Sequence, residues 1–139
     1  MTYVVERNIM VPMRDGVKLA TDIYFPAQNG QPLAGQHPAV LHRTPYNKDE
    51  VEETWSYSRF FAQHGYIAVI QDSRGTYASE GDVNFLVPEA EDGYDALAWI
   101  DQQPWTNGKV APGARRGRGG RKRRRRRWGP KIWRLWCPI

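Results

Sequence analysis

The stretch that decides the fold is Gly65-Tyr66-Ile67-Ala68-Val69-Ile70-Gln71-Asp72-Ser73-Arg74-Gly75. Its first half, residues 66–70, is continuously apolar, as expected of a strand that is covered on both faces. Such strands occur where helices flank a mostly parallel sheet. Its second half turns polar and contains a glycine, so the chain leaves the sheet there. The stretch therefore indicates an α/β architecture, with a loop at the carboxyl end of a buried strand.

The segments around this strand support the same architecture. Alternating apolar residues on either side of Asp15-Gly16 predict a β-hairpin whose second strand is half-buried. Helical spacing predicts two helices, which end at Gly65 and Pro104. The expected elements in chain order are a hairpin (3–11 and 17–25), a loop (26–38), a strand (39–42), a helix (49–64), a strand (66–70), a helix (88–103) and the start of a strand (105–110).

Side-chain spacing also indicates which helical residues face the core. In the first helix, Val51, Trp55, Phe60 and Phe61 lie on or near one face. In the second helix the spacing is set by apolar and flanking residues, namely Tyr94, Leu97, Ala98 and Asp101, with Trp99 and Ile100 adding apolar bulk. Both faces are expected to pack on the sheet.

Function in parallel sheets sits at the carboxyl ends of the strands, which here means residues 43–48 and 72–81. The second segment either faces a substrate or is structural. We favour the structural interpretation, with Asp72 and Arg74 holding the loop by hydrogen bonds and Gly75 at positive φ. Ser73 and Ser79 are not flanked as nucleophiles are.

Charge divides the chain into two parts. Residues 1–110 contain all 15 acidic residues and 8 of the 20 basic ones, for a net charge of −7. Residues 111–139 contain the other 12 basic residues and no acidic one, for +12. The pattern predicts an acidic domain followed by a basic, disordered tail. No apolar run approaches the length of a membrane span and the N-terminus is not a signal peptide, which favours a cytoplasmic protein.

Cysteine and histidine usage argues against a disulfide or a metal site. Cys137 is the only cysteine, so no intramolecular disulfide can form. The three histidines, His37, His42 and His64, lack metal-ligand spacing and are expected at the surface or in turns. We expect neither a metal nor a cofactor.

Five motifs in order resemble the cocaine esterase and Xaa-Pro dipeptidyl-peptidase family of α/β-hydrolases. They are Arg-Asp-Gly-Val-Lys-Leu-Ala-Thr-Asp-Ile-Tyr (14–24), Arg-Thr-Pro-Tyr-Asn-Lys (43–48), the stretch 65–81, the helix 91–100 and Trp-Thr-Asn-Gly-Lys-Val (105–110). The resemblance covers residues 1 to about 110. It implies that the chain is the N-terminal part of an α/β-hydrolase fold. Members of the family cleave small acyl esters or peptide amides with a Ser-His-Asp triad.

The resemblance assigns a role to Tyr46. In the family, the tyrosine of this motif helps to bind the oxyanion, alongside a backbone N–H next to the serine. Position alone instead favours a turn aromatic that caps the core. With the motif, we favour the oxyanion role for the ancestral site.

The chain departs from the family after Val110. It contains no Gly-x-Ser-x-Gly elbow and no serine after Ser79, so the nucleophile, the acid and the histidine of the triad are absent. One base out of frame, codons for Trp-Gly-Ala-Ser would give Gly-Ala-Arg-Arg, which are residues 113–116. We therefore expect residues 111–139 to be an out-of-frame tail and the chain to be an inactive, truncated hydrolase.

The basic tail leaves other functions open. Residues 121–127 could bind nucleic acid through its phosphates, with Trp128, Trp133 and Trp136 stacking on bases. Residues 131–136 could instead lie on an anionic membrane surface. Nucleic-acid binding through the tail is the alternative function.

Overall fold

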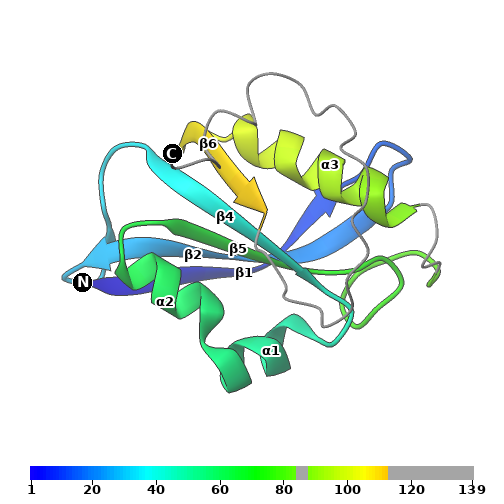
Figure 1. Cartoon of the computed structure of the whole chain (residues 1–139), viewed down its shortest axis with the longest axis horizontal. Helices are drawn as coiled ribbons and strands as arrows, with labels where there is room; N and C mark the ends of the chain where they lie inside the picture. Colours follow the sequence, from blue (N-terminus) through cyan, green and yellow to red (C-terminus); the bar gives the residue numbers. More distant parts are fainter. Residues whose placement is uncertain (84–87, 113–139) are drawn as a thin grey trace, which may run out of the picture.

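The computed structural model describes residues 1–83 and 88–112. The elements, shown in Figure 1, are β1 (Thr2–Pro12), β2 (Lys18–Gln28), β3 (Gln31–Pro32), β4 (His37–Thr44), α1 (Lys48–Trp55), α2 (Tyr57–Gln63), β5 (Ile67–Asp72), α3 (Pro88–Asp101) and β6 (Thr106–Pro112). The expected hairpin, later strands and second helix are therefore confirmed. Of the tail expected to be disordered (111–139), residues 111 and 112 instead end strand β6 and pair with β4, and the rest lies outside the described residues.

One mixed sheet organises the chain. Its strand order is β1-β2-β5-β4-β6, and the two-residue β3 pairs with β2. Strands β4, β5 and β6 are parallel, whereas β2 runs antiparallel to both β1 and β5. The parallel strands of the α/β architecture thus carry an antiparallel hairpin on one side.

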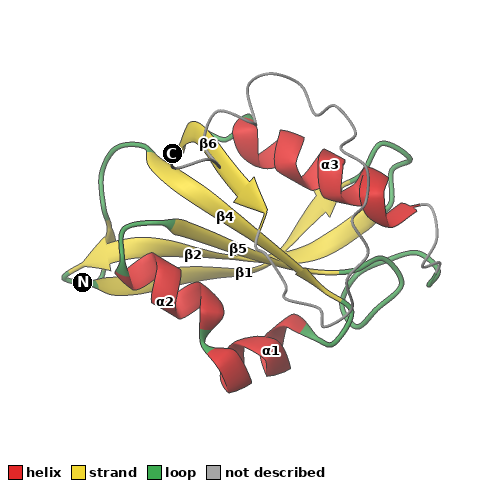
Figure 2. Cartoon of the chain, viewed as in Figure 1, coloured by secondary structure: helices red, strands yellow, loops and turns green. Residues whose placement is uncertain are grey.

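Helices cover both faces of this sheet, with α3 on one face and α1 and α2 on the other (Figures 1 and 2). Alternate residues of β5 divide between the two cores, because successive side chains of a strand point to opposite faces. Ile67 and Val69 join the core under α3, and Ala68 and Ile70 join the core under α2. All six residues of β5 are buried, as its apolar run predicts.

The hairpin strand β2 was expected to be half-buried, and this is wrong. Asp22 and Tyr24 on its supposed solvent face are each 1% exposed. Strand β2 lies inside the sheet, between β1 and β5, and its second face packs under α2. Alternation along one strand cannot reveal a helix that covers the second face from elsewhere in the sequence.

The single helix expected over 49–64 is two helices. The chain breaks at Ser56, which adopts the left-handed conformation with φ 48° and ψ 34°. The buried carboxylate of Glu52 accepts hydrogen bonds from the backbone N–H groups of Ser58 (2.8 Å) and Arg59 (3.0 Å). This carboxylate therefore caps the start of α2, where N–H groups lack partners within the helix.

The break changes which aromatic residues reach the core. Val51 and Phe61 pack against the core as expected, but Trp55 is 76% exposed and Phe60 is 56% exposed. A single helical period extrapolated across Ser56 assigns these two side chains wrongly. The turn at Ser56 resets the period, so each short helix has its own buried face.

Helix α3 also buries a different stripe from the one that its apolar residues indicate. Its buried side chains are Asp92, Ala96 and Ile100, at helical spacing, whereas Tyr94 is 49% exposed. The buried aspartate at the N-terminal end of this stripe needs a cationic partner. That partner comes from the loop after β5.

The expected loop 26–38 is partly a second, short hairpin. Asn29 and Gly30 both have positive φ (53° and 75°), and they turn the chain so that β3 pairs with the end of β2. Asn-Gly, here at 29–30, is the strongest short-range hairpin signal, and it explains why this part of the expected loop pairs with β2. No helix in the described part of the chain is long and apolar enough to cross a bilayer.

Candidate functional site

Two loops meet at the carboxyl end of the parallel strands, as the sequence predicts. Thr44, the last residue of β4, is the register neighbour of Asp72, the last residue of β5. The N–H of Ser73 donates to the carbonyl of Thr44 at 2.9 Å, so the pairing continues one residue beyond β5. The segment 45–47 and the loop 73–83 therefore start side by side.

Tyr46 lies in the turn between β4 and α1. Its backbone N–H donates to the Oγ1 of Thr44 at 3.0 Å, and Thr44 is 2% exposed. The next residue, Asn47, has φ 70° and caps α1 through a hydrogen bond from the N–H of Asp49. The Tyr46 side chain is 56% exposed, so it does not cap the core. The phenol therefore stands at the edge of the sheet where ligands bind in this architecture.

Lys48 fixes the far end of the same turn, and the sequence analysis did not single it out. Its backbone N–H donates to the Oδ1 of Asp72 at 2.7 Å. Its Nζ lies 3.1 Å from the Oδ1 of Asp22 and 3.3 Å from the Oδ1 of Asp49. Lys48 and Asp22 are both almost wholly buried. The available signal for Lys48 was its place in the motif 43–48, two residues after Tyr46. Its partner on β2, Asp22, is distant in sequence and gave no signal.

The loop after β5 is built by its own hydrogen bonds. Ser79 is buried, donates its hydroxyl to the carbonyl of Asp72 (2.7 Å) and accepts from the N–H of Ala20 (2.8 Å). Gly75 has φ 71°, and a Cβ there would collide with the backbone of Asp82 and Val83. The positive φ expected at Gly75 is thus confirmed, and hydrogen bonds hold the loop as expected.

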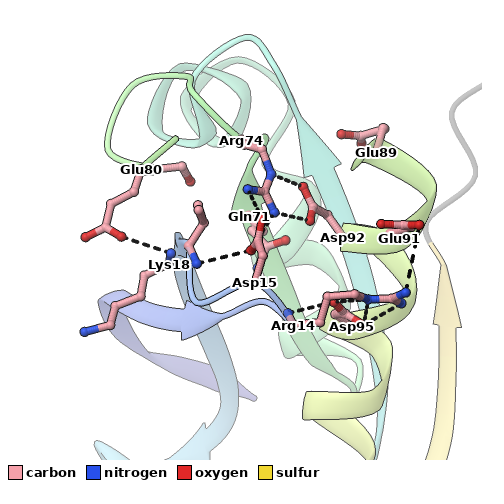
Figure 3. Close-up of polar contacts among 12 residues, drawn as sticks. Arg14, Asp15, Lys18, Gln71, Arg74, Glu80, Glu89, Glu91, Asp92 and Asp95 are labelled. Carbon is pink, nitrogen blue, oxygen red and sulfur yellow. Dashed lines mark hydrogen bonds and ion pairs between the residues drawn. The ribbon is translucent and has the colours of Figure 1, made fainter. Parts of the chain in front are cut away.

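Arg74 connects this loop to two other elements (Figure 3). Its guanidinium binds Asp92 of α3 at 2.7 and 2.9 Å and Asp15 of the β1–β2 turn at 2.8 and 3.1 Å. These contacts raise the pKa of Arg74 and lower that of Asp15. Asp92 is the buried carboxylate on the α3 stripe, and Arg74 supplies its charge partner.

Two more arginines extend the contacts along α3. Arg14 binds both carboxylate oxygens of Asp95, which lowers the pKa of Asp95. The largely buried Arg43 donates to the Oε1 of Gln71 at 2.8 Å and to the Oε1 of Glu89 at 2.6 Å. Burial lowers the pKa of Arg43 and raises that of Glu89. The three arginines together connect α3 to the carboxyl edge of the sheet and to the hairpin turn.

Ser79, His42 and His64 each contact other parts of the fold. The hydroxyl of Ser79 donates to the carbonyl of Asp72, and the Nδ1 of His64 lies 2.7 Å from the carbonyl oxygen of Phe60. His64 lies at the end of α2, but His42 lies inside β4 against the ring of Tyr57, not in a turn. Within the same residues, no cluster of histidine, cysteine or carboxylate side chains could hold a metal ion.

Comparison with protein families gives a match for residues 15–112 to the model of the X-Pro dipeptidyl-peptidase (S15) family. The chain belongs to the S15 family. The match spans the hairpin turn, both loops at the carboxyl edge and β6. S15 membership agrees with the family that the resemblance implies.

Individual S15-type relatives agree with this assignment. The cocaine esterase of Rhodococcus sp. (strain MB1 Bresler) is 45% identical over a 112-residue alignment, which covers 78% of this chain and 18% of that protein. An α-amino acid ester hydrolase structure has TM-score 0.62 and 30% identity, over 80% of this chain and 21% of its own. A CocE/NonD family hydrolase from Staphylococcus aureus has TM-score 0.63 and 25% identity, over 79% and 22%.

The chain spans about a fifth of the length of the curated relatives it matches. The described fold therefore corresponds to an N-terminal part of an S15-type hydrolase domain. In this part, the strand β6 runs beside β4 and ends at Pro112, where the family model match also ends.

Proposed function

We propose that residues 1–110 form the N-terminal portion of a serine hydrolase domain for small acyl esters or peptide amides, and that Tyr46 is its oxyanion donor. The observation that carries this proposal is the exposed phenol of Tyr46 on a fixed turn at the carboxyl end of β4. Cocaine esterase and an α-amino acid ester hydrolase among the relatives support ester substrates, and the family description supports Xaa-Pro peptides.

The chemistry of acyl transfer explains why a phenol is useful at this place. When a serine hydroxyl attacks a carbonyl carbon and a histidine takes its proton, negative charge develops on the carbonyl oxygen. A phenol O–H held at a fixed position can donate a hydrogen bond to that oxygen. Such a donor accelerates the reaction only if it is positioned before the charge develops.

The 139-residue chain by itself is proposed to be inactive. Its sequence has no Gly-x-Ser-x-Gly elbow and no serine after Ser79. An oxyanion donor without a nucleophile can polarise a carbonyl but cannot form an acyl-enzyme.

Residues 111–139 are proposed to be an Arg-rich, out-of-frame tail. Reading the DNA from about codon 105 past the stop tests this, because restoring one base should reopen a long hydrolase frame.

The alternative function, nucleic-acid binding through residues 121–127, falls outside the described residues. The family match and the fold give it no support. It stays a prediction of the tail composition alone.

A chimera tests the proposal directly. Residues 1–112 replace the matching N-terminal region of the Rhodococcus cocaine esterase, and hydrolysis of p-nitrophenyl butyrate and of an Xaa-Pro p-nitroanilide is measured. The proposal expects turnover by the chimera and none above buffer by the 139-residue chain. A folded chimera without activity on either substrate would contradict the hydrolase role of this segment.

A further inference from the structure

We propose that Lys48 is a positioning residue for Tyr46, acting through the buried carboxylates Asp22 and Asp72. The inference rests on the proposed oxyanion role of Tyr46 and deepens it. In this proposal, the carboxylates of Asp22 on β2 and Asp72 on β5 hold the turn that carries the phenol. Lys48 does not touch the substrate in this proposal, because its side chain is only 2% exposed.

The backbone contacts show how the turn is held at both ends. Before Tyr46, the side chain of Thr44 accepts the Tyr46 N–H at 3.0 Å. After it, the Lys48 N–H donates to the Oδ1 of Asp72 at 2.7 Å. Thr44 and Asp72 are register neighbours on parallel strands. Both ends of the turn are therefore hydrogen-bonded to the same position along the sheet. Only three residues, 45–47, lie between these fixed points.

The ammonium group of Lys48 supplies a second attachment, to β2. Its Nζ lies 3.1 Å from Asp22, and Asp22 also accepts the N–H of Asn8 at 2.8 Å. Asp22 pairs in register with Ile70 of β5, so the strand pairing inside the sheet fixes the backbone position of Asp22. A buried charged pair persists only where geometry and further hydrogen bonds offset its desolvation. The pair therefore confines Lys48 to one position.

The conformation of the turn explains why such confinement is needed. Asn47 has φ 70°, in the left-handed region that non-glycine residues adopt at a cost. The Tyr46 side chain is more than half exposed, so core packing alone does not fix it. Contacts at Thr44 and Lys48 can hold the strained turn in one conformation. The turn then fixes the backbone of Tyr46 and the direction in which its side chain leaves the chain.

The test uses the 139-residue chain with 3-fluorotyrosine incorporated at position 46 and 19F NMR as the readout. The variants are Lys48→Met, Lys48→Arg and the double variant Lys48→Met/Asp22→Asn, which removes both charges of the buried Lys48–Asp22 pair. Arg14→Met is the control, because it removes a surface ion pair with Asp95 on α3. Melting temperatures are recorded for every variant.

We expect one narrow line in the wild type and in Arg14→Met. In Lys48→Met and in the double variant, the line should move most of the way toward its position in urea, and Lys48→Arg should largely restore it. A double variant that melts cooperatively and keeps the wild-type line would overturn the proposal.

A second measurement does not depend on variants that fold. In the wild-type chain, the amide hydrogens of Tyr46 and Lys48 should exchange as slowly as those of β5, because each donates to a buried side chain, that of Thr44 or Asp72. Fast exchange at both positions beside a protected β5 would overturn the proposal. A result for Tyr46→Phe in the chimera concerns the oxyanion role alone, so the two failures are distinguishable.

Discussion

The guanidinium of Arg74 binds the carboxylate of Asp92 through two hydrogen bonds, Nη2–Oδ1 at 2.7 Å and Nε–Oδ2 at 2.9 Å (Figure 3). Asp92 lies on the buried stripe of α3, and its side chain is 2% exposed. The planar guanidinium matches both carboxylate oxygens at once, which makes this a strong form of ion pair. The position of α3 on the sheet therefore depends on a loop that begins at the end of β5.

Removing Arg74 should destabilise the fold because it leaves the Asp92 charge buried without its partner. We expect Arg74→Met to lower the free energy of unfolding by about 3 kcal/mol. Urea denaturation followed by tryptophan fluorescence measures the loss. The double variant Arg74→Met/Asp92→Asn should recover part of it, since no buried charge remains. Equal losses in the single and double variants would show that the pair is not the cause.

Acid should weaken the fold through the surface ion pairs. The hydrogen bonds from Arg14 lower the pKa of Asp95, so its stabilising contribution is fully present above its ordinary pKa of about 3.9. That contribution is lost as the pH falls through the lower folded-state value. Arg14→Met should therefore show a shallower loss of stability below about pH 4 than the wild type. Unfolding in urea across this range measures the slope, and identical slopes would contradict the prediction.

Asp72 should act with the opposite sign. Burial raises its pKa, so the fold binds a proton more readily than the unfolded chain does. The resulting cost at neutral pH is relieved as the pH falls through the raised value. Asp72→Asn keeps an acceptor for the Lys48 N–H but removes this titration. Its stability should fall more steeply on acidification than that of the wild type, measured by the same urea series.

Glu52 should be required for the break between α1 and α2. Glu52→Ala removes the acceptor for the N–H groups of Ser58 and Arg59, and we expect a loss of about 2 kcal/mol in unfolding free energy. Glu53→Ala is the matched control, because Glu53 is its exposed neighbour and should change stability little. Similar losses at the two positions would contradict the capping role.

Tyr46→Phe in the chimera should lower kcat by about 10²–10³-fold and change KM little, because an oxyanion contact forms mainly in the transition state. Tyr77→Phe is the control, since Tyr77 is an exposed tyrosine of the neighbouring loop. Initial rates with p-nitrophenyl butyrate give both constants. An unchanged kcat in Tyr46→Phe would remove the oxyanion role.

The order of the elements could be predicted because it depends on local patterns. The apolar run 66–70 became β5, and Asp15-Gly16 closed the hairpin. Where the pattern was interrupted by a single residue, prediction was wrong. Ser56 carries no strong breaker signal, and its left-handed conformation is stabilised by a carboxylate four residues earlier that caps the next helix.

The location of the candidate site was predictable from the sequence, but the buried ion pair that holds it was not. Both loops at the carboxyl edge and the structural role of Gly75 could be read from the sequence, because strand ends and glycines leave local signals. The partners Asp22 and Lys48 lie 26 positions apart in the sequence. No local pattern around either residue predicts that the two side chains meet. A charged residue in an alternating strand is also typical of a solvent face.

By itself, then, the amino-acid sequence determined the family, the strand and helix order, and the edge at which Tyr46 lies, since motifs and periodicity are properties of neighbouring residues. The tertiary structure alone decided which charges are buried. Asp22, Lys48 and Asp92 are buried because elements from distant parts of the chain cover them. Each lies beside an opposite charge brought by another element, since an unpaired buried charge would cost more than the fold can offset.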